Sequence, residues 1–380
     1  MERSVVFVTG EYPPLRGGVG DCTARLGDAL ASRGWSVQVV TRPLPARTDD
    51  ALPIREVSGW GWELRQALRE LRSAGWGGVV HLQYQAGAFD LQGRIALLPV
   101  LAWPIPVVTT FHDLRVPYLF PKAGVLRWSA LRWLARTSAA VVVTNLEDER
   151  VVRRWGVRSA RLWRIPIGPN VPEPGSPIET RARLDLPFER PLVVFFGFRQ
   201  ADKGLETLFA AVARLPEPRP LVVLVGGEQP DARGARAGGS LAEAGAERVL
   251  AVDLGYRPAR EVADLLAAAE AVVLPFRRGA SWRNGTLVAA LACGAAVVTT
   301  RPDDPSLLLP LRDGEHCRLV PPDDPAALAR ALAEMLARPE LRDTLRAGAR
   351  AVAAAFRWER IAARHEQLYE VVLGSPKRPR

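Results

Sequence analysis

Short apolar runs rich in β-branched residues alternate with helical patterns along most of this 380-residue chain. The first run leads into a glycine-containing loop and then into a helical stretch at about 21–33. Strands that are apolar at every position are buried on both faces, so this alternation predicts a parallel sheet covered by helices on both sides. The runs of the first half lie at 4–10, 35–41, 79–84, 106–113 and 139–145.

The alternation breaks at residues 166–191, which carry seven prolines, and then starts again. We therefore predict an α/β protein with two doubly wound, Rossmann-like domains facing each other across a cleft. The predicted parts are a domain at 1–168, a linker at 169–190, a domain at 191–356, and a helix at 357–373 that packs back on the first domain. The runs of the second half lie at 191–198, 220–227, 248–255, 271–276 and 295–300.

The charge balance favours phosphate-bearing partners, since 51 basic residues against 41 acidic ones give a net charge of +10. A generally arginine-rich surface is the alternative explanation. The chain has no zinc-finger spacing, no aromatic ribonucleoprotein motif and no long basic tail, so we expect no nucleic-acid partner. Three isolated cysteines and four scattered histidines suggest neither disulfides nor a metal site, and no run is long enough to cross a bilayer. We therefore expect a cytoplasmic protein.

Three strand-to-loop junctions carry candidate chemistry. The loop at 13–30 contains Gly17 and Gly18 and opens a helix, where free backbone amides favour an anion; the alternative is a tight turn. The run at 106–113 ends in His112 and Asp113, which either face a bound substrate or complete a local turn. The run at 191–198 contains Gly197 and leads into two cations, Arg199 and Lys203.

A fourth junction reads RRGASWRNGTLVAALACG at 277–294, a basic glycine loop that opens an apolar helix. Nothing acidic occurs between Glu270 and Asp303, so this loop is suited to an anion. Its predicted donors are the backbone amides at 284–287 and the Thr286 hydroxyl. The residues concerned are Asn284, Gly285, Thr286 and Leu287, with Arg277, Arg278 and Arg283 as nearby charges.

Together these motifs resemble the family 4 retaining glycosyltransferases of the GT-B fold, over nearly the whole chain. The resemblance is carried by GEYPP…GGVGD, TFHD, VTN, IPIGPNV, GF-R…KGLETL, ADLLAAAEAVVLPF and ALACGAAVVTT…DG…LVPPDDPAALARAL. It implies a hexosyltransferase-like enzyme that uses a nucleotide diphosphate sugar, in the UDP or GDP form, and a sugar or lipid-linked acceptor, with no metal and no other cofactor.

The resemblance also assigns roles to individual residues. It implies that the glycine loop approaches the donor diphosphate or the acceptor, and that His112 lies near the transferred sugar. Arg199 and Lys203 match the pair that neutralises the diphosphate leaving group, although Phe198 intervenes between Gly197 and Arg199. The loop at 284–287 falls in the nucleotide-sugar site.

Two positions depart from the family pattern, because Ser281 and Ala289 stand where relatives usually carry glutamates that contact the donor sugar and the ribose. Ser281 and Asp113 remain candidate contacts for the sugar or the acceptor. The alternative function is a catalytically impaired nucleotide-sugar-binding protein on the same fold. A nicotinamide-dependent oxidoreductase is a further alternative that rests on GGVG alone.

The stretch at 124–138 combines Arg132 and Arg136 with Trp128 and Trp133. Basic residues and tryptophan on one helix are typical of a surface that touches anionic lipid. An ordinary helix with its tryptophans in the core is the alternative. The accompanying hypothesis is peripheral attachment to the inner face of a membrane.

Overall fold

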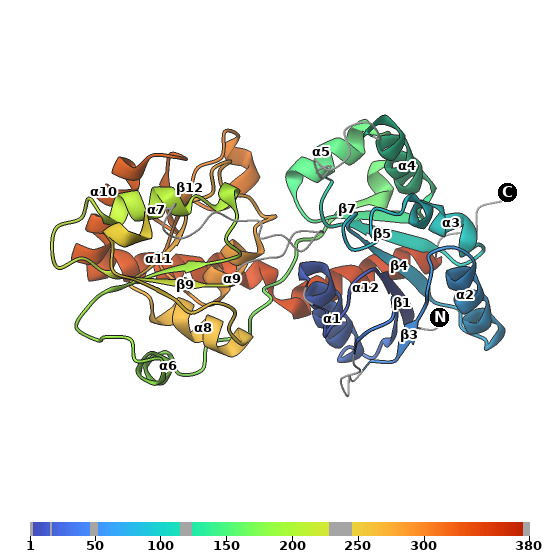
Figure 1. The fold of residues 1–380 in the computed structure, drawn as a ribbon. Helices are drawn as coiled ribbons and strands as arrows, with labels where there is room; N and C mark the ends of the chain where they lie inside the picture. The colour runs from blue at the N-terminus through green and yellow to red at the C-terminus, as the bar shows by residue number, and fades with distance from the viewer. Residues whose placement is uncertain (1–2, 16, 46–51, 115–123, 228–244, 375–380) are drawn as a thin grey trace. The chain divides into compact units, whose positions relative to one another are not determined.

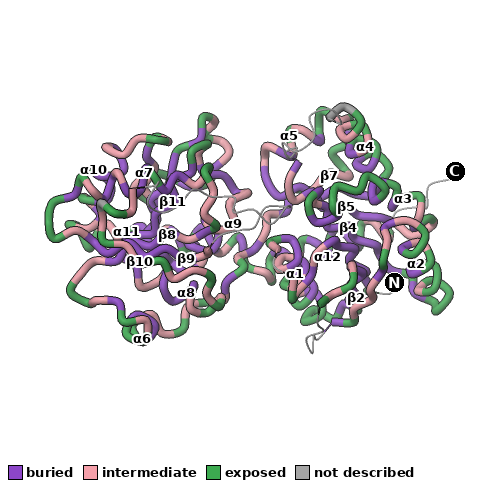
Figure 2. The backbone as a smooth tube through the Cα atoms, in the orientation of Figure 1, coloured by how far each residue is buried: buried purple, intermediate pink, exposed green. Residues whose placement is uncertain are grey.

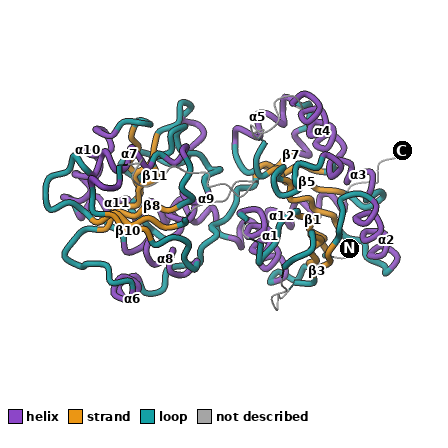
Figure 3. The backbone as a smooth tube through the Cα atoms, viewed as in Figure 1, coloured by secondary structure: helices purple, strands orange, loops and turns teal. Residues whose placement is uncertain are grey.

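The computed structural model describes residues 3–15, 17–45, 52–114, 124–227 and 245–374, and the chain divides into two compact units. Unit 1 comprises Met1–Gly168 and Trp358–Arg380, and unit 2 comprises Pro169–Arg357. Each unit is a parallel sheet with helices on both faces (Figures 1 and 3), as the alternation of apolar runs and helical patterns predicts.

Unit 1 is built on a seven-stranded parallel sheet in the order β3-β2-β1-β4-β5-β6-β7. The order in which the chain adds strands reverses between β1 and β4, which pair directly and in parallel. Five strands match the predicted apolar runs, whereas β3 and β7 were not predicted. The strands are β1 (Ser4–Thr9), β2 (Ser36–Thr41), β3 (Ile54–Glu56), β4 (Val79–Tyr84), β5 (Val107–Phe111), β6 (Ala140–Val143) and β7 (Leu162–Arg164).

Helices α1 and α12 cover one face of this sheet, where Leu30, Leu368 and Tyr369 pack in one core cluster. The other face is covered by α2, α3 and α4 around a second cluster. The helices of unit 1 are α1 (Gly18–Ala31), α2 (Trp62–Ser73), α3 (Leu98–Leu101), α4 (Gly124–Thr137), α5 (Leu146–Arg154) and α12 (Trp358–Gly374), with 3₁₀ helices η1 (Gly93–Leu97) and η3 (Ser159–Arg161).

Unit 2 is built on a six-stranded parallel sheet in the order β10-β9-β8-β11-β12-β13. Here the strand order reverses between β8 and β11. The four central strands are buried almost throughout, whereas the two edge strands are mostly half-buried (Figure 2). The strands of this sheet are β8 (Leu192–Phe196), β9 (Leu221–Val225), β10 (Ala251–Asp253), β11 (Ala271–Leu274), β12 (Val297–Thr300) and β13 (Arg318–Val320).

The helices of unit 2 divide between the two faces of its sheet. Helices α7 and α10 pack on one face, and α8, α9 and α11 pack on the other. Helix α6 falls in the proline-rich stretch and is tied to α8, because Asp264 Oδ2 accepts a hydrogen bond from the Thr180 hydroxyl (2.9 Å). These helices are α6 (Pro177–Arg183), α7 (Leu205–Val212), α8 (Ala259–Ala268), α9 (Gly285–Ala292), α10 (Pro325–Ala337) and α11 (Pro339–Ala353), with 3₁₀ helices η4 (Ala201–Lys203), η5 (Ala246–Arg248), η6 (Pro305–Leu308) and η7 (Ala354–Phe356).

Candidate functional site

The reversal of strand order between β8 and β11 determines where a ligand of unit 2 would bind. Loops that leave two such neighbouring strands run in opposite directions, so a crevice opens beyond their carboxyl ends. Gly197, Arg199 and Lys203 follow β8, and the segment 281–287 follows β11. The fold therefore gathers the residues predicted for the donor site at one topological switch point.

The loop after β8 begins with Gly197, whose φ of +146° lies in a region that side-chain-bearing residues avoid. Its amide donates to Val225 O (2.9 Å), which continues the pairing of β8 with β9. A Cβ atom built on Gly197 would lie 3.4 Å from Thr286 Cγ2. The β8 loop thus touches the first turn of α9, and two predicted donor-binding residues lie side by side.

Lys203 brings a positive charge to the same switch point. Its Nζ lies 5.3 Å from the centroid of the Phe276 ring and 3.6 Å from Asp202 Oδ2. The following residue, Gly204, has φ +69°, and a Cβ there would lie 2.1 Å from Pro275 O, so the two loops touch. The Lys203 side chain is half-buried, with 19% of it exposed.

Arg199 is directed to the other side of β8. It forms an ion pair with Asp253 at the end of β10, and its backbone amide donates to Gly227 O (3.0 Å). The two predicted diphosphate ligands are therefore held by partners on opposite sides of the central strand. Sequence reasoning missed Asp253, although it stands at the end of the predicted run at 248–255.

The loop that opens α9 is closed on itself by Ser281 and Asn284. The Asn284 side-chain oxygen accepts from the Ser281 amide (2.8 Å), and the Asn284 amide donates to Ser281 O (2.9 Å). Asn284 stands at the helix N-cap but its side chain makes no capping bond to α9. Because the first amides of a helix have no partner within it, those of Gly285 and Thr286 face the start of the helix, where a ligand would come.

The side chains that follow point into the core. Leu287 and Ala289 are both 0% exposed, so Leu287 offers only its backbone to a ligand.

Arg277, at the start of this loop, pairs with Asp323 on the surface (3.2 Å), and its backbone amide donates to Asp202 O (3.0 Å).

The glycine loop of unit 1 already holds an anion, the carboxylate of Glu11. Glu11 Oε1 accepts from the amides of Val19 (2.9 Å) and Gly20 (3.3 Å) at the start of α1. A Cβ on Gly17 would lie 2.2 Å from the Glu11 carboxylate, whereas a Cβ on Gly18 would meet no heavy atom within 4 Å. Gly17 makes room for Glu11, and the open side of the loop lies at Gly18.

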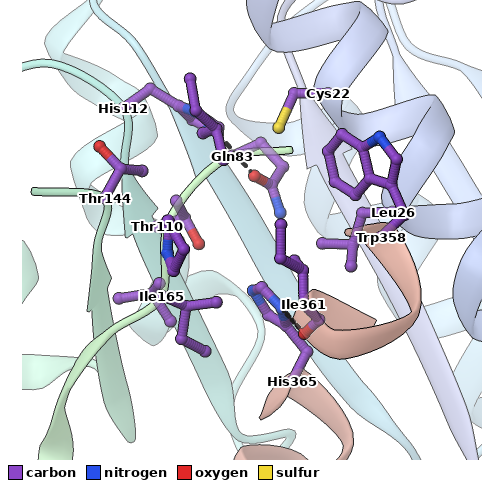
Figure 4. Close-up of a pocket in the computed structure, with 13 residues that line it drawn as sticks. Cys22, Leu26, Gln83, Thr110, His112, Thr144, Ile165, Trp358, Ile361 and His365 are labelled. Atoms are coloured by element: carbon purple, nitrogen blue, oxygen red, sulfur yellow. Dashed lines mark hydrogen bonds between the residues drawn. The ribbon is translucent and has the colours of Figure 1, made fainter. Parts of the chain in front are cut away.

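His112 follows β5 and lines a small pocket in unit 1 (Figure 4). The next residue in the chain, Asp113, is half-buried but does not line this pocket. His112 Nε2 lies 2.7 Å from Gln83 Oε1. Burial, and secondarily the electrostatic interaction with the nearby His365 imidazole, lower the pKa of His112 to about 4, so the imidazole is neutral at neutral pH. The pocket also contains Cys22, and burial raises the pKa of that thiol to about 12.

A buried polar cluster lies beside this pocket and fastens α12 to the sheet. His81 Nδ1 lies 2.6 Å from the Tyr369 hydroxyl and His81 Nε2 lies 2.7 Å from Thr110 Oγ1. His365 Nδ1 donates to Ile361 O (2.9 Å). Burial lowers the pKa of both histidines, that of His365 to about 4. These groups are therefore neutral and hydrogen-bonded, as a structural cluster requires.

Two kinds of feature are absent from the part of the chain that the structure describes. None of its groups of histidine, cysteine, aspartate and glutamate is placed to hold a metal ion. None of the helices described is both long and apolar enough to cross a membrane.

Models of two glycosyltransferase families match the chain. The model described as "Glycosyltransferase Family 4" matches residues 16–171, and the one described as "Glycosyl transferases group 1" matches residues 190–338. Similar curated proteins include the D-inositol 3-phosphate glycosyltransferases of Xylanimonas cellulosilytica (29% identity over 93% of this chain and 91% of the relative) and Streptosporangium roseum (29%, 93% and 88%).

Solved structures resemble the chain over its full length. A sucrose-phosphate synthase from Thermosynechococcus elongatus superposes with a TM-score of 0.76 at 25% identity, covering 98% of this chain and 99% of that one. Anabaena HepE in complex with UDP superposes with a TM-score of 0.73 at 18% identity, covering 97% and 99%. At 18% identity, the similarity to HepE is a similarity of fold alone.

Proposed function

The chain belongs to the family 4 glycosyltransferases and has their GT-B fold, and from this premise we propose that it is a retaining, metal-independent enzyme that uses a nucleotide diphosphate sugar. The donor carries UDP or GDP, and the acceptor is a sugar or a lipid-linked sugar. The observation that carries the proposal is the switch point of unit 2, where Lys203, Gly197 and the N-terminus of α9 come together.

The chemistry of this switch point suits a departing diphosphate. Negative charge develops on the diphosphate as the glycosidic bond breaks, and preorganised cations and amides stabilise that charge. Lys203 supplies a cation, and the amides of Gly285 and Thr286 supply donors at the positive end of a helix. The absence of a side chain at Gly197 lets a phosphate approach the backbone. Arg199 would join them by exchanging its partner Asp253 for the ligand.

A mechanism that retains the anomeric configuration of the donor sugar is compatible with the same residues. Attack on the face from which the diphosphate leaves needs no protein nucleophile, so it does not depend on the glutamates replaced by Ser281 and Ala289. His112, as a neutral imidazole, would contact the sugar through a hydrogen bond rather than donate a proton as an acid. Ser281 and Asp113 remain the proposed polar contacts for sugar or acceptor.

The direct test is a screen of UDP-, GDP- and ADP-sugars for hydrolysis and for transfer to sugar and lipid-linked acceptors. We expect turnover with one nucleotide class and a product of unchanged anomeric configuration by NMR. Lys203→Ala should weaken nucleotide binding about 10- to 150-fold, the equivalent of one charged hydrogen bond of about 1.5–3 kcal/mol. Arg330→Ala, which removes an exposed cation on α10, is the matched control and should leave binding unchanged.

Two outcomes would contradict the proposal. Binding without turnover on any acceptor would indicate the catalytically impaired binding protein. No nucleotide binding at all, or equal binding by the Lys203→Ala variant, would remove the donor site from this loop.

A second proposal, contact with an anionic membrane, rests on five exposed apolar residues of η1, α3, the turn after α3 and α4. We propose that they form one apolar patch, because η1, α3 and α4 contact one another. Trp128 is not part of it, because its ring packs on Trp155 (5.6 Å between centroids). Arg132 and Arg136 are exposed on the same helix as two of the patch residues. Apolar side chains flanked by arginines suit a lipid surface and a lipid-linked acceptor. The patch residues are Leu97, Val100, Trp103, Leu126 and Trp133.

Vesicle sedimentation tests this second proposal. Vesicles that contain phosphatidylglycerol should retain the protein at low salt, and vesicles of neutral lipid should not. The double variant Trp103→Ala, Trp133→Ala should lose binding, while Ile178→Ala, which removes an exposed apolar residue of unit 2, should keep it. Equal sedimentation of both variants would contradict the proposal.

A further inference from the structure

The register of β4 and β5 explains why Gln83 and His112 meet. Gln83 lies opposite Thr110, and side chains two residues apart on a strand share a face, so Gln83 and His112 are diagonal neighbours. His81 lies opposite Val108 and reaches Thr110 along the same diagonal (2.7 Å). The face of the sheet toward α12 therefore carries two successive polar rungs, His81–Thr110 and Gln83–His112.

Gln83 is an unusual residue for this place. Its side chain is only 1% exposed, and its Oε1 accepts from His112 across 2.7 Å. Its Nε2 is buried and has no hydrogen-bond partner among the residues that the structure describes. Figure 4 shows this amide directed into the pocket, toward α12. A buried amide that leaves one donor unmatched costs stability, so the residue is kept for something other than packing.

The hydrogen bond decides which nitrogen of His112 carries the proton. A carbonyl oxygen can only accept, so His112 Nε2 is the donor, and in a neutral imidazole the other nitrogen then has a lone pair. Burial keeps the imidazole neutral by lowering its pKa to about 4. His112 Nδ1 is accordingly a hydrogen-bond acceptor, which a hydroxyl group satisfies and a phosphate oxygen does not.

The other end of the pocket supports this orientation of the amide. His365 also lines the pocket, and its Nδ1 donates to Ile361 O, so its Nε2 is an acceptor as well. The Gln83 amide nitrogen makes no hydrogen bond to that acceptor, but a donor directed toward α12 is compatible with it, whereas the reversed amide would direct an oxygen toward it.

We propose that Gln83 is a positioning residue that holds His112 in the Nε2–H form, so that Nδ1 accepts a hydrogen bond from a hydroxyl of the bound sugar. The part that concerns the sugar rests on the proposed function; the part that concerns the tautomer does not.

The tautomer can be read directly with ¹⁵N-histidine NMR on the intact protein, because the two ring nitrogens differ strongly in shift when one is protonated. The chain has four histidines, so the signals of His112 are identified by their loss in His112→Gln. We expect a single Nε2–H form in the wild type at neutral pH. Gln83→Glu keeps an acceptor, so it should keep the Nε2–H form and raise the pKa of His112. Gln83→Leu should give a mixture of both forms.

Activity supplies the second readout. In Gln83→Leu we expect kcat/KM to fall at least about tenfold, as when the outer partner of a functional histidine is removed. Gln83→Glu should regain much of this activity at high pH and lose it near neutrality as His112 becomes protonated, whereas the wild type should not change there. Gln66→Leu, an exposed glutamine on α2, is the control and should match the wild type.

An Nδ1–H form in the wild type, or the same tautomer in Gln83→Leu, would overturn the positioning role whether or not the enzyme turns over. The expected tautomers together with no transfer to any acceptor would leave the positioning role standing and contradict the proposed function. A Gln83→Leu variant with the pH profile and kcat/KM of the wild type would contradict the proposed contribution of Gln83 to sugar transfer.

Discussion

Restoring the family's second glutamate as Ala289→Glu should destabilise this protein rather than improve it. Ala289 lies in the middle of α9 with 0% exposure and belongs to the core cluster beneath that helix. A carboxylate in such a place must either be protonated or be buried as a charge. Because the position is fully buried, the new side chain would have no direct access to solvent in the ligand-free protein.

The cost follows from the expected pKa. Complete burial raises a carboxyl pKa from about 4.3 by up to about 3–5 units, so the folded variant keeps this carboxyl mostly protonated at pH 7. The penalty is then set by the roughly 2.7 units between the unfolded pKa and pH 7, and at about 1.4 kcal/mol per unit it is about 3.5 kcal/mol. That is a large part of the stability of a domain, about 5–15 kcal/mol. The folded pKa lies above the unfolded one, so this charge penalty is present at neutral pH and disappears as the pH falls below about 4, where both states are protonated.

The assay is chemical denaturation of Ala289→Glu and Ala289→Gln at about pH 7 and pH 5. The glutamine has the same size without the charge, so it measures the cost of overpacking alone, about 1–3 kcal/mol. We expect the glutamate variant to be the less stable at pH 7 and the difference to shrink at pH 5. A glutamate variant that is as stable as the wild type and binds nucleotide more tightly would contradict the burial of position 289, because that position would then face the ligand.

Three further predictions concern unit 1. Tyr369→Phe leaves the buried His81 Nδ1 without its partner and should cost about 1–3 kcal/mol, measured by denaturation; an unchanged midpoint would mean that the hydroxyl is dispensable. Glu11→Ala removes the acceptor for two amides of α1 and should cost about 1–2 kcal/mol, and Glu11→Gln should cost less; equal loss in both would show that only the charge matters. Burial lowers the pKa values of His112 and His365 from 6.5 to about 4, so the stability that they contribute is present above pH 6.5 and lost by about pH 4, up to about 3 kcal/mol each. Melting curves should therefore fall across that window, less steeply in His365→Gln, and parallel curves would contradict this.

The sequence predicts the fold well where strands are buried on both faces. Apolar runs such as 79–84 and 191–198 contain β4 and β8, because a parallel sheet covered on both sides needs no polar alternation. The strands that were missed, β3, β7 and β13, have three residues each and are mostly half-buried at or near a sheet edge. Three residues are too few to show any periodicity.

The candidate site could be predicted only in part. Gly197, Lys203 and His112 are visible as chemistry-bearing residues at the ends of apolar runs. The partners of these residues could not be predicted. The contacts Gly197–Thr286 and Gln83–His112 join segments that are distant in sequence, and strand order and register decide whether such segments meet. A single sequence determines neither the strand order nor the register. The same holds for Arg199 and Asp253, which come from β8 and β10, strands separated by β9.

A nucleotide diphosphate that binds against Lys203 would shield its amine, and the composition of the chain allows this to be measured directly. Only three of the 51 basic residues are lysines, at positions 122, 203 and 377. We would measure the rate of amine-selective labelling at each lysine by mass spectrometry, without nucleotide and with a saturating amount of UDP or GDP. We expect one of these nucleotides to slow labelling of Lys203 and to leave the labelling of Lys122 and Lys377 unchanged. Labelling of Lys203 at the same rate with and without either nucleotide would contradict nucleotide binding against Lys203.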